Sequence, residues 1–518
     1  MQRYNILWAD DEIDLLKPHI IFLEAKGYDV TPVHSGTDAL EKLEQEQYDV
    51  VFLDENMPGI SGLETLHQIK STKPALPVIM ITKSEEEYIM EEAIGAKIAD
   101  YLIKPLNPNQ ILLSVKKILE NKKLISKKTN TGYQQDFRHI AMAYNERIGH
   151  EEWADIYKKL IYWELEIDNT ENKSMKEIID MQKNEANTNF SKFILEEYED
   201  WLNDADADKP VLSNTLLKKK VFPLLKDKEK VFLFIIDNLR YDQWKIIEPL
   251  LNPYYTVTEE SSYYSILPTT TNFARNSIFS GLMPSEMEKK HPELWVNDDE
   301  EDAKNNSEEQ FLAAHLSRNG LGAIKMNYQK ITHASAGKTM ADTIQNLYNN
   351  DLNVVVYNFV DMLSHARTDT EMIRELAPDE SAYRSITYSW FQHSPLLDAI
   401  KKIAGKGFKI VITTDHGTIR VKKPYKIIGD KNTNTNLRYK HGKNLAFDEG
   451  HVLVARKPER FFLPKRNVST AYVFTTEDYF FAYPNNFNYY VNYYKDTFQH
   501  GGISLEEMII PFVVLKSK

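Results

Sequence analysis

The sequence predicts an α/β protein of three domains, of which the middle one is helical throughout. Two observations lead to this prediction. The chain has 518 residues, which is too long for one ordinary core. Short apolar runs alternate with amphipathic stretches over residues 1–120 and again from Val231 onwards, whereas residues 121–210 have helical spacing and no strand signal. We place the domains at residues 1–122, 123–210 and 211–518.

The first and third domains are expected to contain buried parallel strands. In the first, the runs NILWA, VTPV, VVFLD, PVIMIT and ADYLI are separated by segments with helical periodicity, which predicts five βα units in a doubly wound sheet. In the third, KVFLFIID, LNVVVYNFVD and FKIVITTD are apolar runs that each end in Asp, and IIPFVVLK predicts a final strand. The middle segment predicts a helical spacer.

Composition excludes several classes of protein. No apolar run approaches the roughly 20 residues that cross a bilayer, and the acidic start of the chain holds no secretory segment, so we expect a cytoplasmic protein without membrane insertion. The absence of cysteine excludes thiolate zinc sites, so any metal must be held by Asp, Glu, His or hydroxyl oxygen. The net charge is -13, and residues 1–122 hold 12 basic and 21 acidic side chains, so the acidity belongs mainly to the first domain. The overall charge does not indicate a nucleic-acid binder, which leaves a local basic groove as an open alternative.

Side chains suited to a metal ion and a phosphoryl group follow the strands of the first domain. They are Asp10, Asp11, Asp54, Thr82 and Lys104. Ligands bind beyond the carboxyl ends of the strands in such a sheet, so we expect these side chains to meet. Oxygen ligands favour Mg²⁺, with which Asp54 can attack a phosphoryl group. One strand-end Asp is commonly a helix cap, but five such residues at successive strand ends are hard to obtain by chance.

These residues, with the segments ADDE, DENMPGISG and MITK and the Lys104–Pro105 pair, resemble the receiver domain of response regulators, a flavodoxin-like fold. The resemblance implies phosphorylation of Asp54 by a sensor histidine kinase. The implied magnesium ligands are Asp10, Asp11, Asp54 and Asn56. The implied switch residues are Thr82, Lys104 and Tyr101. Lys83 departs from the small residue that many receivers have at this place.

The third domain contains strand-end Asp residues with His nearby. Asp361 and His365 are four residues apart, which can bring both side chains to one face of a helix, and Asp415 is followed directly by His416. Two Zn²⁺ ions can clamp the oxygens of an in-line displacement, and coordination can activate a threonine hydroxyl. Taken singly, His500 could be a loop histidine, the DHG segment a turn, and the three threonines from Thr269 an N-cap.

In chain order, however, these segments resemble the alkaline phosphatase superfamily, in particular the PglZ-type domain and, around the nucleophile, nucleotide pyrophosphatase/phosphodiesterases. The segment from Pro268-Thr269-Thr270-Thr271 to Ser280-Gly281-Leu282-Met283-Pro284 carries the resemblance, which implies an alkaline-phosphatase-like α/β sandwich with Thr271 as nucleophile. One implied zinc ion is bound by Asp361, His365 and His500. The other is bound by Asp237, Asp415, His416 and Thr271. Ala274 replaces an Asn of the phosphodiesterases, which leaves Asn272 or Arg275 to bind the substrate.

A basic segment, NTNLRYKHGKN at residues 434–444, is expected to be a loop. Its basic side chains are Arg438, Lys440, His441 and Lys443. Two interpretations stay open. The segment is either a solvated surface loop or an electrostatic clamp, in which Arg438 and Lys440 bind a polyanionic substrate.

The order of receiver, helical spacer and PglZ-type domain resembles the PorX-type response regulators of Bacteroidetes, which control type IX secretion. This resemblance implies a homodimer on phosphorylation, a metal-dependent phosphodiesterase acting on nucleotide-type phosphodiesters such as cyclic or linear oligonucleotides, and contact with a sigma factor. Two alternatives remain: a regulatory binding module that contacts transcription machinery, and a transcription factor. The lack of a recognisable helix-turn-helix after residue 120 counts against the latter.

Overall fold

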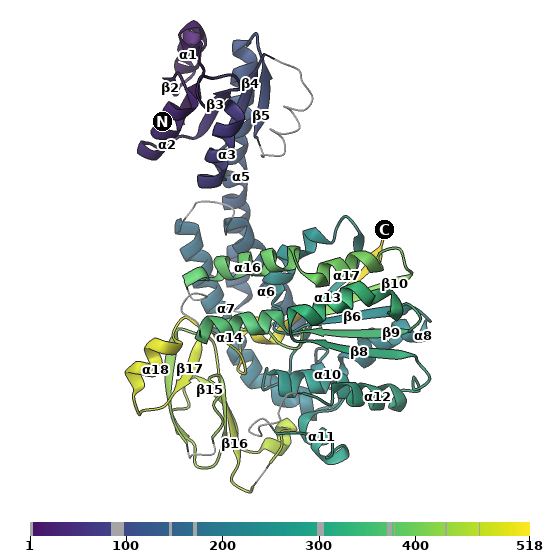
Figure 1. The fold of residues 1–518 in the computed structure, drawn as a ribbon. Helices are drawn as coiled ribbons and strands as arrows, with labels where there is room; N and C mark the ends of the chain where they lie inside the picture. The colour runs from purple at the N-terminus through teal and green to yellow at the C-terminus, as the bar shows by residue number, and fades with distance from the viewer. Residues whose placement is uncertain are drawn as a thin grey trace. The chain divides into compact units, whose positions relative to one another are not determined.

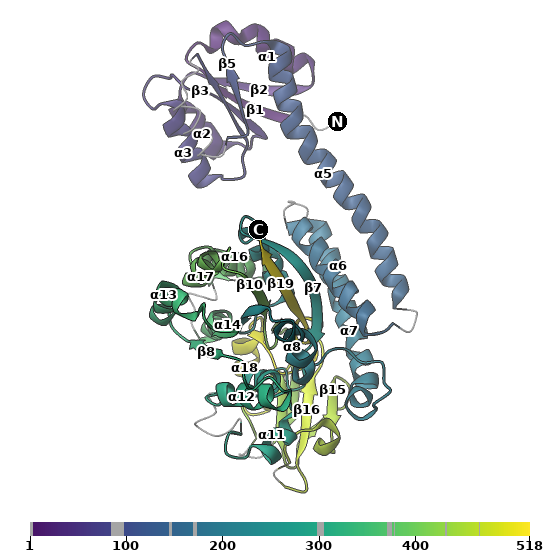
Figure 2. The ribbon, with the colours of Figure 1, turned by 90° about the vertical axis from the view of Figure 1, so that its right-hand side faces the viewer.

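The computed structural model forms two compact units, Met1–Gln135 and Asp136–Lys518, each of which is treated by itself (Figures 1 and 2). The described residues are 4–83, 98–144, 148–168, 173–297, 305–369, 375–377, 379–429, 433–465 and 467–518. For some residues in these ranges the structure describes the backbone but not the side chain. These are residues 117, 120–132, 134, 135, 138, 173, 174 and 365–369. Among the described residues, no helix is both long enough and apolar enough to cross a lipid bilayer.

The first unit is a parallel sheet of five strands in the order β2-β1-β3-β4-β5, which confirms the predicted doubly wound fold. The strands are β1 (Tyr4–Ala9), β2 (Tyr28–Val33), β3 (Val50–Asp54), β4 (Val78–Thr82) and β5 (Asp100–Ile103). The helices are α1 (Lys17–Ala25), α2 (Gly36–Gln45), α3 (Gly62–Thr72) and the start of α5 (Pro108–Ala143). Because successive side chains of a strand point to opposite faces, Trp8 packs into one apolar core and Leu7 into the other.

The spacer is helical, as the sequence predicts, and its first helix has no break at the expected boundary. Residue 122 falls inside α5, because no proline interrupts residues 109–143. The next helices are α6 (His150–Asp168) and α7 (Lys173–Asn203). The domain limits given above therefore stay predictions.

The second unit is built on a sheet of six strands in the order β7-β19-β10-β6-β9-β8. The strands are β6 (Lys230–Ile236), β7 (Tyr255–Tyr264), β8 (Met326–Ile331), β9 (Leu352–Tyr357), β10 (Phe408–Thr413) and β19 (Ile509–Ser517). Strands β10, β6, β9 and β8 are parallel, whereas β19 runs antiparallel to both β10 and β7. The four apolar runs of the sequence are β6, β9, β10 and β19.

Helices cover both faces of this sheet, so that it forms the middle layer of an α/β sandwich. In Figure 1, α13, α16 and α17 lie above the sheet, and α10 and α12 lie below it. The helices of this region are α8 (Phe222–Lys226), α9 (Tyr241–Ile247), α10 (Asn276–Ser280), α11 (Pro284–Lys290), α12 (Glu308–Arg318), α13 (Ala334–Thr343), α14 (Phe359–Asp369), α16 (Glu380–Gln392), α17 (Pro395–Ile403) and α19 (Leu505–Met508). The parallel strands place the carboxyl ends of β6, β9 and β10 at one edge.

Small sheets extend the domain between β10 and β19. The first pairs β11 (Ile419–Arg420) with β18 (Phe498–Gln499), and the second has the order β14-β12-β17, with β12 (Lys423–Ile428), β14 (Ala446–Phe447) and β17 (Tyr479–Ala482). The third has the order β13-β16-β15, with β13 (Tyr439–Gly442), β15 (Val452–Ala455) and β16 (Ala471–Thr475). The helix α18 (Phe487–Tyr494) lies beside β17 in Figure 1.

Buried ion pairs join the spacer to the sandwich within the second unit. Glu164 of α6 contacts Lys183 of α7 at 2.6 Å and Arg384 of α16 at 2.8 Å. Arg384 also contacts Asp242 of α9 at 2.9 Å, and Asp242 pairs with Arg240 at 2.6 Å. Burial by itself would raise the pKa of Glu164, but the charges of Lys183 and Arg384 outweigh it and lower this pKa to about 2. The spacer helices are therefore held by charges as well as by apolar packing.

Candidate functional site

The acidic cluster of the first unit lies at the carboxyl ends of β1 and β3. Asp10 follows β1 and Asp54 ends β3, both buried, while Asp11 is exposed. One carboxylate oxygen from each lies within 4.8 Å of the others. The backbone N–H of Asn56 donates to Asp54 Oδ2 at 3.1 Å, and the Asn56 side chain is exposed. The structure thus brings the three carboxylates together.

Lys104 bridges two of these carboxylates. Its Nζ lies 2.7 Å from Asp54 Oδ1 and 2.9 Å from Asp10 Oδ2. Burial raises the pKa of Asp54 against the opposing effect of Lys104. Burial would lower the pKa of Lys104, but its bonds to both carboxylates outweigh that effect and raise it. This side chain occupies the position from which a cation would contact a phosphoryl oxygen on Asp54.

The two remaining switch residues lie on neighbouring strands. Thr82 ends β4 and donates its hydroxyl to Glu55 Oε2, a contact that the sequence did not predict. Tyr101 of β5 is half-buried and packs against the core that contains Met80. The Thr82 hydroxyl is therefore directed to the residue that follows Asp54 rather than to Asp54 itself.

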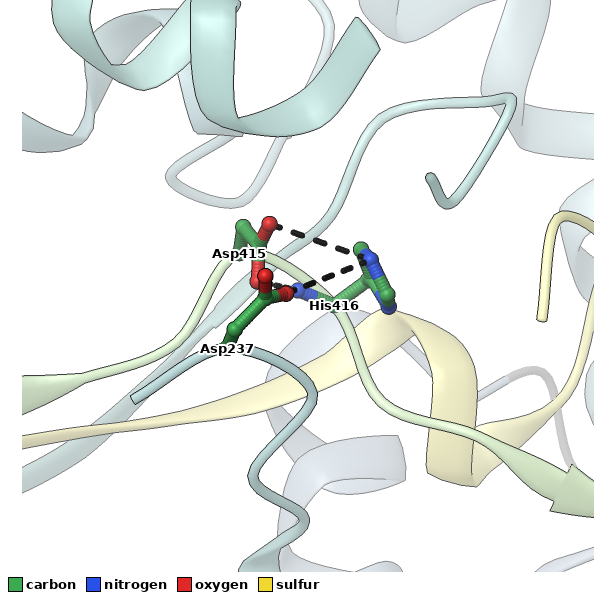
Figure 3. Close-up of side chains that lie close together, drawn as sticks. All are labelled: Asp237, Asp415 and His416. Atoms are coloured by element: carbon green, nitrogen blue, oxygen red, sulfur yellow. Dashed lines mark hydrogen bonds and ion pairs between the residues drawn. The ribbon is translucent and has the colours of Figure 1, made fainter. Parts of the chain in front are cut away.

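A second cluster lies at the carboxyl ends of β6 and β10. Asp237 follows β6, and Asp415 and His416 follow β10 after one intervening residue (Figure 3). All three are buried, and one ligand atom from each lies within 4.8 Å of the others. His416 Nδ1 lies 3.1 Å from the carbonyl oxygen of Gly417, so a proton on Nδ1 is satisfied and Nε2 remains available as a ligand atom.

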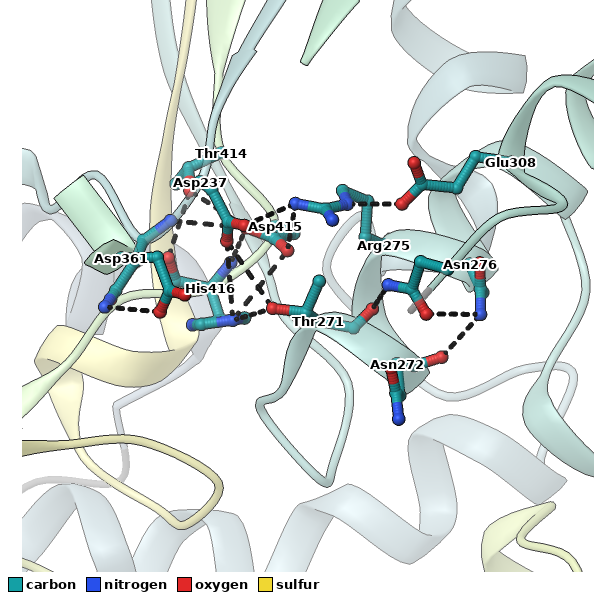
Figure 4. A network of polar contacts seen from close by, with 12 residues as sticks. Asp237, Thr271, Asn272, Arg275, Asn276, Glu308, Asp361, Thr414, Asp415 and His416 are labelled. Atoms are coloured by element: carbon teal, nitrogen blue, oxygen red, sulfur yellow. Dashed lines mark hydrogen bonds and ion pairs between the residues drawn. The ribbon is translucent and has the colours of Figure 1, made fainter. Parts of the chain in front are cut away.

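Thr271 faces this cluster. Its Oγ1 lies 3.1 Å from His416 Nε2 and 3.5 Å from Asp237 Oδ1 (Figure 4). It is the first residue of a π-helical turn, Thr271–Arg275, that leads into α10. The expected nucleophile and three expected ligands therefore converge on one point, although they come from three separate segments of the chain.

Arg275 contacts two of the carboxylates that we expect to bind metal. Its Nη1 lies 2.6 Å from Asp237 Oδ2 and 3.7 Å from Asp415 Oδ2, and its Nε lies 2.6 Å from Glu308 Oε1. The side chain is 1% exposed. We expected Arg275 to bind the substrate; these contacts correct that expectation, because the guanidinium is buried and neutralised by carboxylates. Burial raises the pKa of Asp237, which the charge of Arg275 only partly offsets.

Residues expected to hold another metal ion lie next to the cluster of Asp237, Asp415 and His416. His500 Nε2 is 3.7 Å from Asp361 Oδ1, and the rings of His500 and His416 stack with centroids 4.3 Å apart. His365 lies on α14, four residues after Asp361, but its side chain is outside the described part of the chain. Asn238 connects the two groups, because its side chain donates to Asp361 Oδ1 at 3.4 Å and its backbone N–H to Asp415 Oδ1 at 3.4 Å.

The structure corrects the expected basic loop. Its centre is strand β13, and Arg438 is fully buried in a salt bridge of 2.6 Å with Glu507. Lys440 is also buried, donates to the carbonyl oxygen of Asn434 at 2.7 Å, and has its pKa lowered by burial to about 7. Neither side chain can act as a surface clamp. Asn272, the other expected substrate-binding residue, is half-buried, and in Figure 4 its amide points away from the ligand cluster.

Sequence reasoning missed several contributors. Asn238 has a left-handed backbone conformation, with φ of 64°, which Asn adopts more readily than most residues. An Asp-Asn pair directly after a predicted strand could therefore have indicated a tight turn at this site. Gly417 is required because a Cβ there would lie 2.0 Å from the carbonyl oxygen of Glu506. Glu308 and Glu55 gave no signal, since nothing in their sequence neighbourhood indicates a partner far along the chain.

The two clusters offer different donor sets for metal ions. Two carboxylates and an imidazole around Asp415 fit Zn²⁺, whereas the all-oxygen cluster around Asp54 fits Mg²⁺. Asp415 Oδ2 is buried and, in the part of the chain that the structure describes, accepts no hydrogen bond. Its nearest described basic groups, Arg275 Nη1 at 3.7 Å and His416 Nε2 at 3.8 Å, lie beyond hydrogen-bonding distance, so a lone pair of this buried oxygen stays open to a metal ion. The residues present therefore fit the metals that the sequence leads us to expect.

Comparison with protein families gives three matches in the same order as the three predicted domains. The models describe a response regulator receiver domain at residues 6–116, a PorX response regulator linker domain at residues 123–202, and a BREX system PglZ alkaline phosphatase-like domain at residues 216–515. The last of these covers more than half of the chain.

Curated relatives share one part of this chain. The transcriptional regulatory protein ResD of Bacillus subtilis is 35% identical over 115 residues, which cover 22% of this chain and 48% of that protein. The alkaline phosphatase synthesis transcriptional regulatory protein PhoP of the same organism is 33% identical over 122 residues, covering 23% and 50%. The chain thus spans about half the length of these relatives. A CheY-like receiver from Methanospirillum hungatei is 27% identical, covers 23% of this chain and 96% of its own, and has a TM-score of 0.23.

The phosphoacceptor cluster, its sheet and the domain order define a response regulator with a receiver domain and a separate output domain. The chain belongs to the PglZ alkaline phosphatase-like family, and its receiver, linker and output domains have the PorX-type architecture.

Proposed function

We propose that the output domain is a metal-dependent phosphodiesterase with Thr271 as its nucleophile. The observation that carries this proposal is the position of Thr271 Oγ1, 3.1 Å from His416 Nε2 and 3.5 Å from Asp237 Oδ1. A metal ion held by His416 and Asp237 would therefore also be within reach of the Thr271 hydroxyl. The family match to an alkaline phosphatase-like domain supports a phosphoester as the substrate.

Two zinc ions are the proposed cofactors of the output domain, and magnesium is the proposed ion of the receiver. When bound, the zinc ions would activate the Thr271 hydroxyl and offset charge on the phosphoryl oxygens. Asp237, Asp415 and His416 would hold one ion with Thr271. Asp361, His365 and His500 would hold the other.

The chain's own residues orient these groups. Gly417 accepts from His416 Nδ1, which directs Nε2 towards Thr271. Arg275 holds Asp237 Oδ2, so that Oδ1 is the oxygen nearest the Thr271 hydroxyl. The site is therefore ordered by partners that do not themselves contact the reacting atoms, which limits the rearrangement required on substrate binding.

Charge around the site supports a phosphodiester over a phosphomonoester. A dianionic monoester needs more cationic donors than a monoanionic diester. Three cations that the sequence offered for this purpose have other partners, since Arg275 contacts Asp237 and Glu308, Arg438 contacts Glu507, and Lys440 is buried. We propose nucleotide-type phosphodiesters, including linear or cyclic oligonucleotides, as substrates.

The test is turnover by wild type and Thr271→Val with bis-p-nitrophenyl phosphate and p-nitrophenyl phosphate. We expect the diester to be preferred, and Thr271→Val to lose at least about a hundredfold in kcat because the hydroxyl is absent while the volume is kept. Zinc content by elemental analysis should be two per chain and should fall in Asp415→Asn. Full activity of Thr271→Val contradicts the nucleophile, and a preference for the monoester contradicts the substrate class.

The receiver domain implies a sensor kinase as partner. We further propose that a histidine kinase phosphorylates Asp54, that phosphorylation favours a homodimer, and that the output contributes to control of type IX secretion, with a sigma factor as a candidate partner. The bridge from Lys104 to Asp54 supports the first step, because Lys104 is already within bonding distance of the carboxylate that would receive the phosphoryl group.

A further inference from the structure

The helix α18 presents an unusual amount of aromatic surface. Its eight residues, FNYYVNYY, contain five aromatic rings and no charge. Phe487, Val491 and Tyr494 pack against the small apolar core that contains Ile419 and Phe480. Tyr489 and Tyr490, in contrast, are 64% and 38% exposed. The inward stripe explains why the helix forms, but not why its outer face is tyrosine.

The four tyrosines of α18 form ordered pairs. The rings of Tyr489 and Tyr493 stack with centroids 6.2 Å apart and planes 15° apart, and those of Tyr490 and Tyr494 stack at 6.2 Å and 11°. The rings are nearly parallel within each i, i+4 pair, whereas the two pairs are close to perpendicular to each other, and Tyr494 also packs against the core. Flat rings held in this way are a stacking surface, because their side chains lose little further freedom when a planar ligand binds.

A pocket with a cationic side chain adjoins this helix. It has a volume of 540 Å³ and is lined by Tyr425, Phe447 and Phe487, with Lys426 at its wall. Lys426 Nζ lies 5.0 Å from the centroid of Phe487, and, within the described residues, Lys426 forms no ion pair. The stretch from Ile419 to Ile428 contains four basic residues, of which Arg420 pairs with Asp496 and Lys423 with Asp478. The surface thus combines aromatic rings with available positive charge, although Asp448 also lines the pocket.

The same surface is connected directly to the ligand cluster. Strand β11 begins three residues after His416, and β18 ends one residue before His500, and these two strands pair with each other. Tyr494 precedes His500 by six residues, which span at most about 20 Å when fully extended. The ribbon β11–β18 therefore has the proposed metal ligands at one end and the aromatic surface at the other.

We infer that α18 and the adjoining face of β12 form a binding platform for the unpaired bases of a single-stranded oligonucleotide whose phosphodiester lies at Thr271. This inference rests on the proposed function. Aromatic rings stack on any base, and cations beside them follow the phosphate backbone, which is how single strands are bound without sequence preference. A polyanion with planar bases matches both features, whereas a neutral peptide would match only the apolar one.

Binding can be measured apart from catalysis. Chelator-treated full-length protein, a fluorescein-labelled oligothymidylate of twelve nucleotides and fluorescence anisotropy give the affinity without turnover. The double variant Tyr489→Ala, Tyr490→Ala should bind about tenfold or more weakly, and Lys426→Gln should weaken binding and flatten its salt dependence. The matched control Tyr162→Ala removes an exposed tyrosine of α6, which is 55% exposed, and should bind as the wild type does.

Two further measurements decide between ligands. Inorganic polyphosphate of the same charge should compete poorly, because it has no bases to stack. If it competes as well as the oligonucleotide, the surface is a non-specific cationic patch and the proposed platform is wrong. In metal-loaded protein, the double variant should lower kcat/KM for the oligonucleotide relative to that for bis-p-nitrophenyl phosphate. Wild-type affinity in the double variant refutes the platform even if Thr271 proves to be the nucleophile. Loss of activity in Thr271→Val with intact binding leaves it standing.

Discussion

The two acidic clusters of this protein each contain a cation beside two carboxylates, but the cations differ in type and in exposure. In each, a cation bridges two carboxylates: Lys104 lies between Asp10 and Asp54, and Arg275 lies beside Asp237 and Asp415. The Lys104 side chain is 12% exposed. Arg275 is 1% exposed and is held from its other side by Glu308. A lysine is a mobile point charge on a flexible stem, whereas the arginine fork fixes two partners at once.

This difference suits two kinds of chemistry. A phosphoacceptor must admit an ion and a phosphoryl group and later release them, so its internal cation has to move. A hydrolytic site must return to the same geometry after every turnover, so its internal cation has to stay. Substitutions can test whether the cation of the receiver cluster is more mobile than the cation of the output cluster.

The largest expected effect is that of removing the fixed cation. Arg275→Met leaves Asp237 and Glu308 as buried charges without their partner, so the free energy of unfolding of metal-free protein should fall by about 3–5 kcal/mol. Urea unfolding monitored by circular dichroism measures this. Lys104→Met should cost clearly less, because Lys104 is 12% exposed and Arg275 is 1% exposed, so water already screens the ion pairs of Lys104 more. Equal losses in the two variants would abolish the contrast, and adding Glu308→Gln to Arg275→Met should restore part of the stability.

A second effect should appear in the stability of the output domain when the pH is lowered. Burial lowers the pKa of His315 to about 4, with Arg318 and Lys218 acting in the same direction against the carbonyl of Phe279. The unfolded chain binds this proton near its ordinary pKa of about 6.5 and the folded chain only near 4, so stability is lost as the pH falls between these values.

The loss attributable to His315 is at most about 3.5 kcal/mol, since each pKa unit corresponds to about 1.4 kcal/mol. Thermal unfolding of wild type and His315→Gln at a series of pH values isolates it, because carboxylates with raised pKa values contribute equally to both proteins. The difference between the two curves should change between pH 6.5 and pH 4 and be constant above. A constant difference over the whole range would mean that His315 stays neutral for another reason.

The smallest expected effect concerns the adjustable cluster. Thr82 must leave Glu55 before it can contact a phosphoryl oxygen, and Glu55→Gln replaces a charge-assisted hydrogen bond by a neutral one, which is weaker by about 1 kcal/mol. Dimer formation in sedimentation velocity should then need about fivefold less beryllofluoride. Glu46→Gln, an exposed carboxylate of the same domain, is the control, and Asp54→Ala should not respond. No dimer in the wild type at saturating beryllofluoride contradicts the proposed assembly.

Most of the fold was predictable because buried parallel strands are continuous apolar runs. Strand ends were predictable for the same reason, and with them the positions of Asp54, Asp237 and Asp415. The partners of charged residues were not. Arg438 has a basic sequence neighbourhood that is typical of a surface loop, yet Glu507, 69 residues away, holds it in the core. A charged side chain is buried when an oppositely charged partner, often distant in sequence, pairs with it. The local sequence pattern cannot predict that partner.

The ion pairs between spacer and sandwich determine where this chain can be divided. Sequence comparison alone would suggest a fragment starting near residue 211, at the edge of the enzyme-like region. Such a fragment would lose Glu164 and Lys183, so Arg384 would keep Asp242 but lose Glu164, and Glu506 would lose its ion pair with Lys183. A fragment that starts before His150 retains both α6 and α7. A piece that keeps the proposed site with its supporting charges therefore includes two helices that contribute no residue to that site.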